Sequence, residues 1–250
     1  MQALRNLLLK TADDALILGH RNSEWTGLGP ILEEDIAFSS MAQDKIGHAL
    51  ALYTILHDQL GEPEPDHLAF RRPEKEFYCC HMVELPIGEY DFTTIRHFLF
   101  DHAELLRYDL FSNSAYGPLS ALARKIKGEL KYHVLHADSW VMRLSRGTDE
   151  SYNRLQSALN NTYSLALGMF EIPDNEQELI NDKIFSGENK LKSLWEEKVG
   201  DLAKKAGLEI PVVENKMAGF GGRKGHHTEF LHGILEEMTQ VFKLEEKVEW

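Results

Sequence analysis

The sequence is poor in cysteine and in long apolar runs, and both shortages limit what the chain can be. Its two cysteines, Cys79 and Cys80, are neighbours that cannot close an ordinary disulfide bridge, and no second pair completes a four-cysteine zinc site. No apolar run approaches the roughly 18 residues needed to cross a bilayer. The first residues, Met1 to Arg5, lack the layout of a signal peptide. We therefore expect a cytoplasmic protein with no membrane partner.

Positive charge is also scarce. The chain has 27 Lys and Arg residues against 40 Asp and Glu residues, which gives a formal net charge of -13. The cationic side chains are scattered rather than gathered into a stripe, so the chain should repel nucleic-acid phosphates. We expect no nucleic-acid partner, and a protein or a small molecule fits the charge better.

Strand patterns are nearly absent, and the eight prolines stand mostly near the ends of segments. What remains is helical periodicity in long stretches, which predicts an all-α fold. Long helices are expected over 2–22, 30–60, 91–114 and 117–146, with Pro30 in the first turn of the second one. Shorter helices are expected over 149–171, 174–184, 187–206 and 227–243.

The spacing of the long helices indicates a particular bundle. Two antiparallel pairs are separated by a connection of about thirty residues, as in a ferritin-like four-helix bundle, which needs one long crossover between its halves. We predict one domain over 1–250, since 43% of its residues are hydrophobic and no composition break divides it. The core bundle would cover about 2–146, and additional C-terminal helices over about 149–243 would decorate it.

Ferritin-like proteins that hold two irons follow a fixed ligand pattern. One carboxylate comes from the first helix of each pair and a Glu-x-x-His motif from the second, because residues three apart share a helix face. In the first pair, Asp14 and Asp44 stand about thirty positions apart, as opposed residues should. The residue three after Asp44 is Gly47, which offers no imidazole.

The second pair lacks a ligand as well. Asp101 stands opposite His133, but the residue three before His133 is Leu130, which offers no carboxylate. We therefore interpret these positions as a vestigial di-iron site, and we expect no metal and no catalytic residue in this chain. The six vestigial positions are Asp14, Asp44, Gly47, Asp101, Leu130 and His133.

Several polar side chains near these positions leave alternatives open. One is a metal-free hydrogen-bonded network in the core, because buried charges need partners when no metal neutralises them. Its candidate members are Lys45, His48, His97, Glu104 and Glu129. A second is an autonomous di-metal oxidase or oxygenase with a divergent ligand set, namely Asp14, Asp44, His48, Asp101, Glu129 and His133. In the third, these polar side chains simply lie on the surface and face water.

A glycine-rich segment from Gly219 to Gly225 precedes the last predicted helix. Backbone amides and two cations there could hold an anion, but the segment lacks the spacing of a nucleotide-binding loop. We interpret it as a flexible turn or docking loop, with His226 and His227 as part of it. The residues of this possible anion or docking loop are Gly222, Arg223, Lys224 and Gly225. Motifs of nucleophilic hydrolysis and of dinucleotide binding are absent.

Several sequence blocks, spread over nearly the whole chain and in the right order, carry a resemblance to one family. The blocks are Asn22 to Gly27, Leu68 to Phe70 with Arg72, Lys127 to His133, Arg143 with Leu144, Gly147 to Asp149, and Gly221 to Glu229. The last block is the most specific of them. The chain resembles the family of the C component of the multicomponent ring-1,2-phenylacetyl-CoA epoxidase, also called phenylacetyl-CoA oxygenase.

The resemblance implies a structural subunit of an NADPH-dependent monooxygenase complex in aerobic phenylacetate breakdown. Such a subunit pairs with a homologous catalytic subunit that holds the di-iron centre, and a dimer of such heterodimers is a further expectation. No cofactor is expected in this chain. Iron, FAD and an iron–sulfur cluster would belong to the partner subunits.

Overall fold

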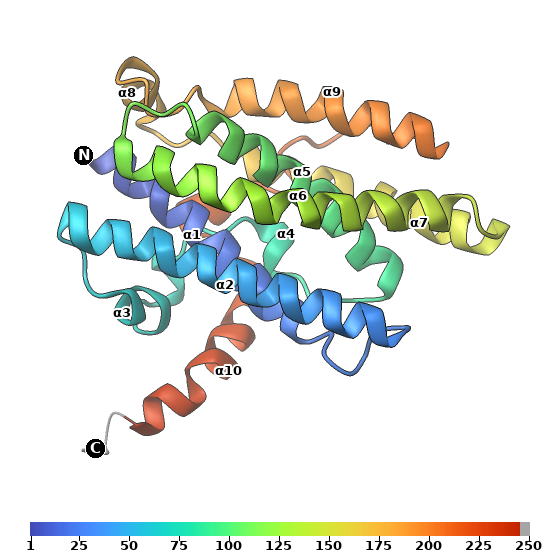
Figure 1. Cartoon of the computed structure of the whole chain (residues 1–250), viewed down its shortest axis with the longest axis horizontal. Helices are drawn as coiled ribbons and strands as arrows, with labels where there is room; N and C mark the ends of the chain where they lie inside the picture. The colour runs from blue at the N-terminus through green and yellow to red at the C-terminus, as the bar shows by residue number, and fades with distance from the viewer. Residues whose placement is uncertain (246–250) are drawn as a thin grey trace. The chain divides into compact units, whose positions relative to one another are not determined.

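The computed structural model describes residues 1–245, and none of these residues lies in a β-strand, so the all-α prediction is confirmed. Figure 1 shows the helices in chain order. The α-helices are α1 (Gln2–Ser23), α2 (Leu32–Leu60), α3 (Pro65–Phe70), α4 (His81–Glu84), α5 (Tyr90–Phe111), α6 (Gly117–Ser145), α7 (Asp149–Ala166), α8 (Glu176–Asn181), α9 (Glu188–Ala206) and α10 (Glu229–Glu245). Three short 3-10 helices accompany them, namely η1 (Glu74–Glu76), η2 (Leu167–Phe170) and η3 (Gly222–Lys224).

Every predicted helix is present, although the bounds of several helices differ from the prediction. Helix α2 begins at Leu32, so Pro30 precedes it instead of standing in its first turn. The Asp35 carboxylate accepts hydrogen bonds from the backbone amides of Gly27 (3.2 Å) and Gly29 (2.7 Å), and this holds the preceding turn outside the helix. The predicted 91–114 helix ends three residues earlier, and the predicted 174–184 helix shrinks to α8.

The chain divides into two compact units. The first unit comprises residues 1–86 together with the residues from Gly221 on, and the second comprises residues 87–220. The prediction of one domain over 1–250 stays a prediction, and its last residues, 246–250, lie outside the described residues.

Helices α1 and α2 form an antiparallel hairpin in the first unit. The Tyr53 hydroxyl donates to Asp13 at 2.6 Å, and the hydroxyls of Thr26 and Ser39 lie 2.8 Å apart nearer the turn. Helix α1 is buried around its whole circumference, as the burial of three successive residues, Leu7 to Leu9, shows. A helix buried on every side must find partners for each polar group that it carries.

The second unit is built on the antiparallel helices α5 and α6. His102 of α5 lies 2.8 Å from Asp138 of α6, and Lys127 pairs with Asp109 closer to the turn. Helices α7 and α9 cover α5 from the other side, where the Trp195 indole donates to the carbonyl of Leu99 at 2.8 Å. Among the described residues, no helix combines the length and the apolar character that a membrane span requires.

Candidate functional site

On the second hairpin, three of the predicted positions come together. Carboxylate oxygens of Asp101 and Glu104 on α5 and a ring nitrogen of His133 on α6 all lie within 4.8 Å of one another, and all three residues are buried. His97 joins them, since its Nδ1 lies 2.8 Å from Asp101 Oδ2. These residues form a buried polar cluster, and its carboxylate and imidazole atoms are close enough together to share a metal ion.

The carboxylate missing from this hairpin is replaced by an aliphatic side chain. Leu130 stands one turn before His133, and both residues are fully buried, so both lie on the inner face of α6. Glu129 is only half-buried and lies beside that face. The inner face therefore reads Leu-x-x-His where a metal-binding hairpin would carry Glu-x-x-His.

On the first hairpin, the structure corrects the predicted register. Asp44 is half-buried and Gly47 is exposed, whereas Lys45 (0% exposed) and His48 (3% exposed) form the buried pair three residues apart. The predicted pairing of Asp14 with Asp44 was wrong because it placed the turn between the two helices too early in the chain. The pairing of Asp13 with Tyr53 shows that residues of one level stand forty positions apart near Asp13, so the centre of the hairpin lies further along the chain than assumed.

The corrected register changes which residue replaces the missing ligand. The inner face of α2 reads Lys-x-x-His, with Lys45 where a carboxylate would stand in a metal-binding hairpin. An ammonium group at that position repels a metal cation instead of binding it. Each hairpin thus keeps a histidine and lacks the carboxylate three residues before it.

Asp14 is neutralised by an arginine. The two NH groups of Arg223 lie 2.7 Å from the two carboxylate oxygens of Asp14, and the backbone amide of Cys80 donates to the same carboxylate at 2.8 Å. The side chains are 2% exposed for Arg223 and 9% for Asp14. Sequence reasoning missed this pair because 209 positions separate the two residues.

The neighbouring Asp13 has its own arginine. Arg72 NH2 lies 2.5 Å from Asp13 Oδ1, and the backbone amide of Tyr78 donates to Asp13 Oδ2 at 2.7 Å. Burial raises the pKa of the Tyr53 hydroxyl well above its ordinary value, and the charge of Asp13 raises it further. Both acidic residues in the middle of α1 are therefore paired with guanidinium groups and not with each other or with Lys45.

The predicted docking loop binds to its own chain. We use the name docking loop for residues 221–228. A Cβ on Gly222 would lie 2.2 Å from the carbonyl oxygen of Cys79, and one on Gly225, whose φ is +75°, would lie 2.3 Å from that of Lys75. Only glycine allows such close approach. Since Arg223 is committed to Asp14, the structure does not support it as an anion ligand, while Lys224 is exposed.

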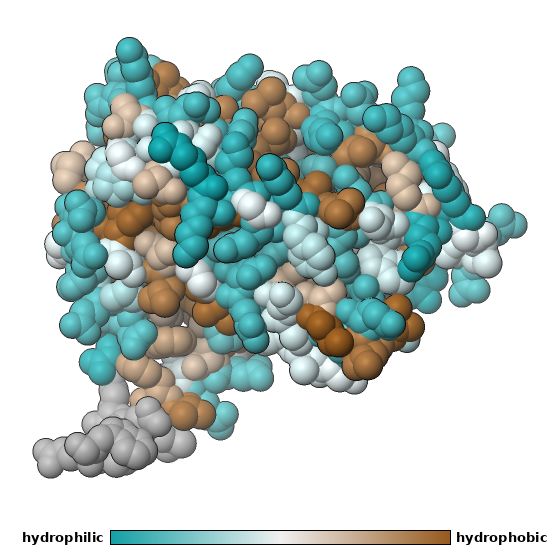
Figure 2. All heavy atoms as spheres, viewed as in Figure 1, coloured by the Kyte–Doolittle hydropathy of each residue, from teal (hydrophilic) through white to brown (hydrophobic). Residues whose placement is uncertain are grey.

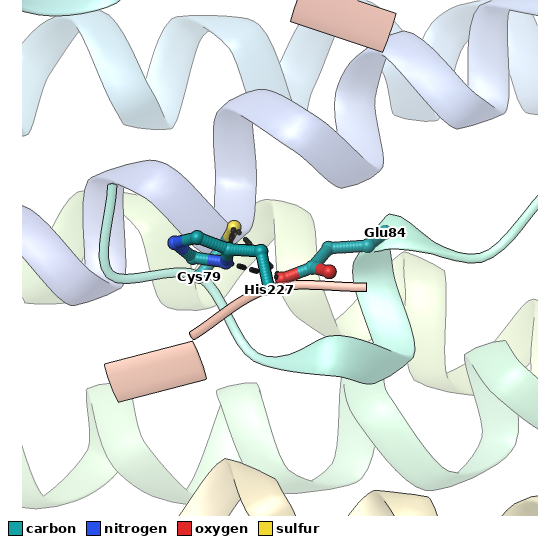
Figure 3. Close-up of side chains that lie close together, drawn as sticks. All are labelled: Cys79, Glu84 and His227. Atoms are coloured by element: carbon teal, nitrogen blue, oxygen red, sulfur yellow. Dashed lines mark hydrogen bonds and ion pairs between the residues drawn. The ribbon is translucent and has the colours of Figure 1, made fainter. Parts of the chain in front are cut away.

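A further cluster, absent from the sequence prediction, lies where the docking loop meets residues 77–84 (Figure 3). His227 Nδ1 lies 2.7 Å from Glu84 Oε1, and Cys79 Sγ lies 3.5 Å from the same oxygen. Thr228 donates to Glu84 Oε2 from its backbone amide and from its hydroxyl, each at 2.7 Å. His227 belongs to the most specific sequence block, which was the one available signal.

The electrostatics of this cluster follow from burial and hydrogen bonds. Burial by itself would raise the pKa of Glu84, but the hydrogen bonds from His227 and Thr228 outweigh it and hold the pKa below its ordinary value. Burial raises the pKa of the Cys79 thiol well above its ordinary value, and the Glu84 charge adds to that effect. The free thiol is therefore protonated at neutral pH and is a poor nucleophile.

All 250 residues match the family described as phenylacetic acid catabolic protein. The chain belongs to this family. Among curated relatives, the C component of 1,2-phenylacetyl-CoA epoxidase from Escherichia coli (strain K12) is 29% identical over 250 residues, which cover the whole of both chains. The phenylacetic acid catabolic protein family is ferritin-like, as the sequence predicted for this member.

The ferritin-like fold implies a di-iron centre, but the residues of this family member do not fit one. Such a centre needs a Glu-x-x-His motif on the second helix of each hairpin. This chain has Lys45 and Leu130 at the glutamate positions of those motifs, and its Asp14 is bound by Arg223. The described residues therefore do not supply the full ligand set of a di-iron centre.

Proposed function

We propose that this chain is the structural, non-catalytic subunit that pairs with a homologous di-iron subunit in an epoxidase acting on phenylacetyl-CoA. The observation that carries the proposal is the replacement of one glutamate in each hairpin, by Lys45 on α2 and by Leu130 on α6. A subunit that lacks the full di-iron ligand set would serve the complex through its shape and its surface. The name of the Escherichia coli relative, which is the C component of such an epoxidase, supports the choice of complex.

An exposed apolar stripe on α2 offers a surface for the partner. Leu32, Ile36, Ile46 and Leu50 are 69%, 61%, 38% and 53% exposed, and their spacing places them on one face of the helix. Figure 2 shows hydrophobic atoms gathered at the surface over the start of α2. Exposed apolar side chains gathered on one helix face mark an interaction site more often than single scattered ones do, although Ser39 and Gln43 separate the two pairs here. The stripe is therefore the surface that we assign to the partner.

The same proposal assigns catalysis to the partner and a structural role to this chain. Dioxygen activation would take place on the partner's di-iron centre, with electrons from NADPH delivered through a reductase that carries FAD and an iron–sulfur cluster. This chain would hold the catalytic subunit in its working conformation. A cytoplasmic complex of two heterodimers is the assembly that we expect.

Co-expression with the homologous di-iron subunit tests the proposal. The two chains should elute as one species at micromolar concentration, and its mass reports whether one or two heterodimers form. Replacement of Ile36 or Leu50 by Glu should weaken association at least about tenfold, since a charge would be buried at the contact. Val212→Glu, at a loop position 94% exposed, is the matched control and should leave association unchanged. Separate elution of the unmodified chains would overturn the proposal.

A further inference from the structure

Three different metal-ligand atoms meet at one buried point in the first unit (Figure 3). They are Sγ of Cys79, Oε1 of Glu84 and Nδ1 of His227. Cys79 and Glu84 are fully buried, and the side chain of His227 is 1% exposed. Thiolate, carboxylate and imidazole are the three ligand types that zinc takes from proteins.

The separations of the three atoms are close to those around a tetrahedral zinc ion. Zinc bond lengths of about 2.0–2.3 Å place neighbouring ligand atoms about 3.3–3.7 Å apart. The observed separations are 3.5 Å from Cys79 to Glu84, 4.0 Å from Cys79 to His227 and 2.7 Å from Glu84 to His227. The Cys79–His227 distance must close by about 0.3 Å and the Glu84–His227 distance must open by about 0.6 Å, and replacement of the shared proton by a cation between the three atoms would bring about both changes.

The contacts behind the ligand atoms fix their orientation. The other ring nitrogen of His227, Nε2, lies 3.0 Å from the backbone carbonyl oxygen of Phe77. A proton held on Nε2 makes Nδ1 the nitrogen that can give up its shared proton and offer a lone pair to a cation. The two donors from Thr228 occupy Glu84 Oε2 and leave Oε1 directed at the same point. Outer contacts of this kind are typical of protein metal sites.

We propose that Cys79, Glu84 and His227 bind one zinc-class divalent cation, which fastens the docking loop to residues 77–84. A thiolate, a carboxylate and a neutral imidazole carry two negative charges, so a divalent cation leaves the buried site neutral. Binding releases two protons, one from the Cys79 thiol and one from between Glu84 and His227. The thiolate and the imidazole select zinc over magnesium or calcium. Metal binding at this site does not depend on the proposed assembly with a catalytic subunit.

A metal titration of the full chain tests the site. After treatment with a chelator, the protein should take up about one zinc ion per chain, measured by elemental analysis, and zinc should raise its Tm. Cobalt(II) should bind in the same ratio and give a sulfur-to-cobalt charge-transfer band in the near ultraviolet. That band requires a coordinating thiolate, so it separates this site from the cluster around His133, which has no sulfur.

Matched variants assign the ligands. Cys79→Ala and His227→Gln should lose the cobalt band, whereas Cys80→Ala, a buried neighbour, and His226→Gln, an exposed neighbour, should keep it. If the unmodified chain gives no stoichiometric cobalt band, or if the band survives in Cys79→Ala, the proposal is overturned and the cluster is a hydrogen-bonded lock only. The titration of the unmodified chain tests the metal site even if a variant does not fold. The presence or absence of the cobalt band does not affect whether the chain co-elutes with a di-iron subunit.

Discussion

Arg223 neutralises the buried carboxylate of Asp14. Its guanidinium meets both oxygens of Asp14 in a bidentate arrangement, which is the strongest geometry for such a pair. A buried ion pair adds little to the free energy of unfolding compared with two apolar residues of similar size. Removal of one partner, however, leaves the other charge buried without compensation. A substitution of Arg223 alone should therefore reveal its contribution to stability.

Replacement of Arg223 by Ala should lower the free energy of unfolding by about 3–5 kcal/mol, because Asp14 would remain buried without its cation. Urea denaturation of the purified chain measures the change. Lys224→Ala removes an exposed cation from the same loop and should change the free energy by less than about 0.5 kcal/mol. Equal effects of the two substitutions would show that the ion pair does not stabilise the fold.

Tyr163 gives a residue-level prediction at alkaline pH. It stacks on Trp195, and burial, together with the charge of Glu196, raises its pKa from 10.0 to about 12. Because the folded protein resists ionisation of this phenol, its contribution to stability is complete below pH 10 and is lost as the pH rises towards 12. Tyr163→Phe should therefore flatten the fall of the unfolding free energy over this range in urea titrations. An unchanged slope would contradict the assignment.

At the scale of elements, the helical hairpins could be predicted from the sequence, whereas the packing of the docking loop could not. The long helices form wherever apolar residues recur with the helical period, so their existence was predictable and their ends were less so. The docking loop folds back through glycines that allow two carbonyl groups to come close. The sequence suggested a docking loop, but only the fold revealed that it docks onto residues 75–80.

Gly222→Ala should detach part of the docking loop, because its Cβ would lie 2.2 Å from the carbonyl oxygen of Cys79. We expect a loss of about 2 kcal/mol or more in the free energy of unfolding. The change should be accompanied by faster proteolysis after Lys224. Retention of parental stability and protease resistance would contradict the close approach.

Gly47→Ala is the opposite case, on helix α2. Nothing lies within 4 Å of the Cβ that would be added, and alanine favours a helix over glycine. The variant should therefore be more stable by about 0.5–1 kcal/mol in thermal or urea unfolding. A destabilised variant would indicate that Gly47 lies against other groups and that the register predicted from the sequence was right.

At the scale of the whole molecule, the hairpins keep the framework of a ferritin-like protein without the full ligand set. After anaerobic loading with ferrous iron and removal of excess metal, the chain should hold fewer than two irons, because Lys45 and Leu130 replace two of the carboxylates. Elemental analysis measures the ratio. Two irons per chain would revive the autonomous oxidase that the sequence left open.

The sequence by itself determined the helical class, the acidic surface and the loss of a carboxylate at Leu130, because periodicity, charge and spacing along one helix are local properties. Only the tertiary structure decided that Lys45 and His48, and not Asp44 and Gly47, face inward on α2. It also paired Asp14 with Arg223 and brought His227 to Glu84, across 209 and 143 positions. Such contacts depend on the register that a turn imposes on two antiparallel helices and on where a segment distant in the sequence packs. A local sequence pattern predicts neither of them.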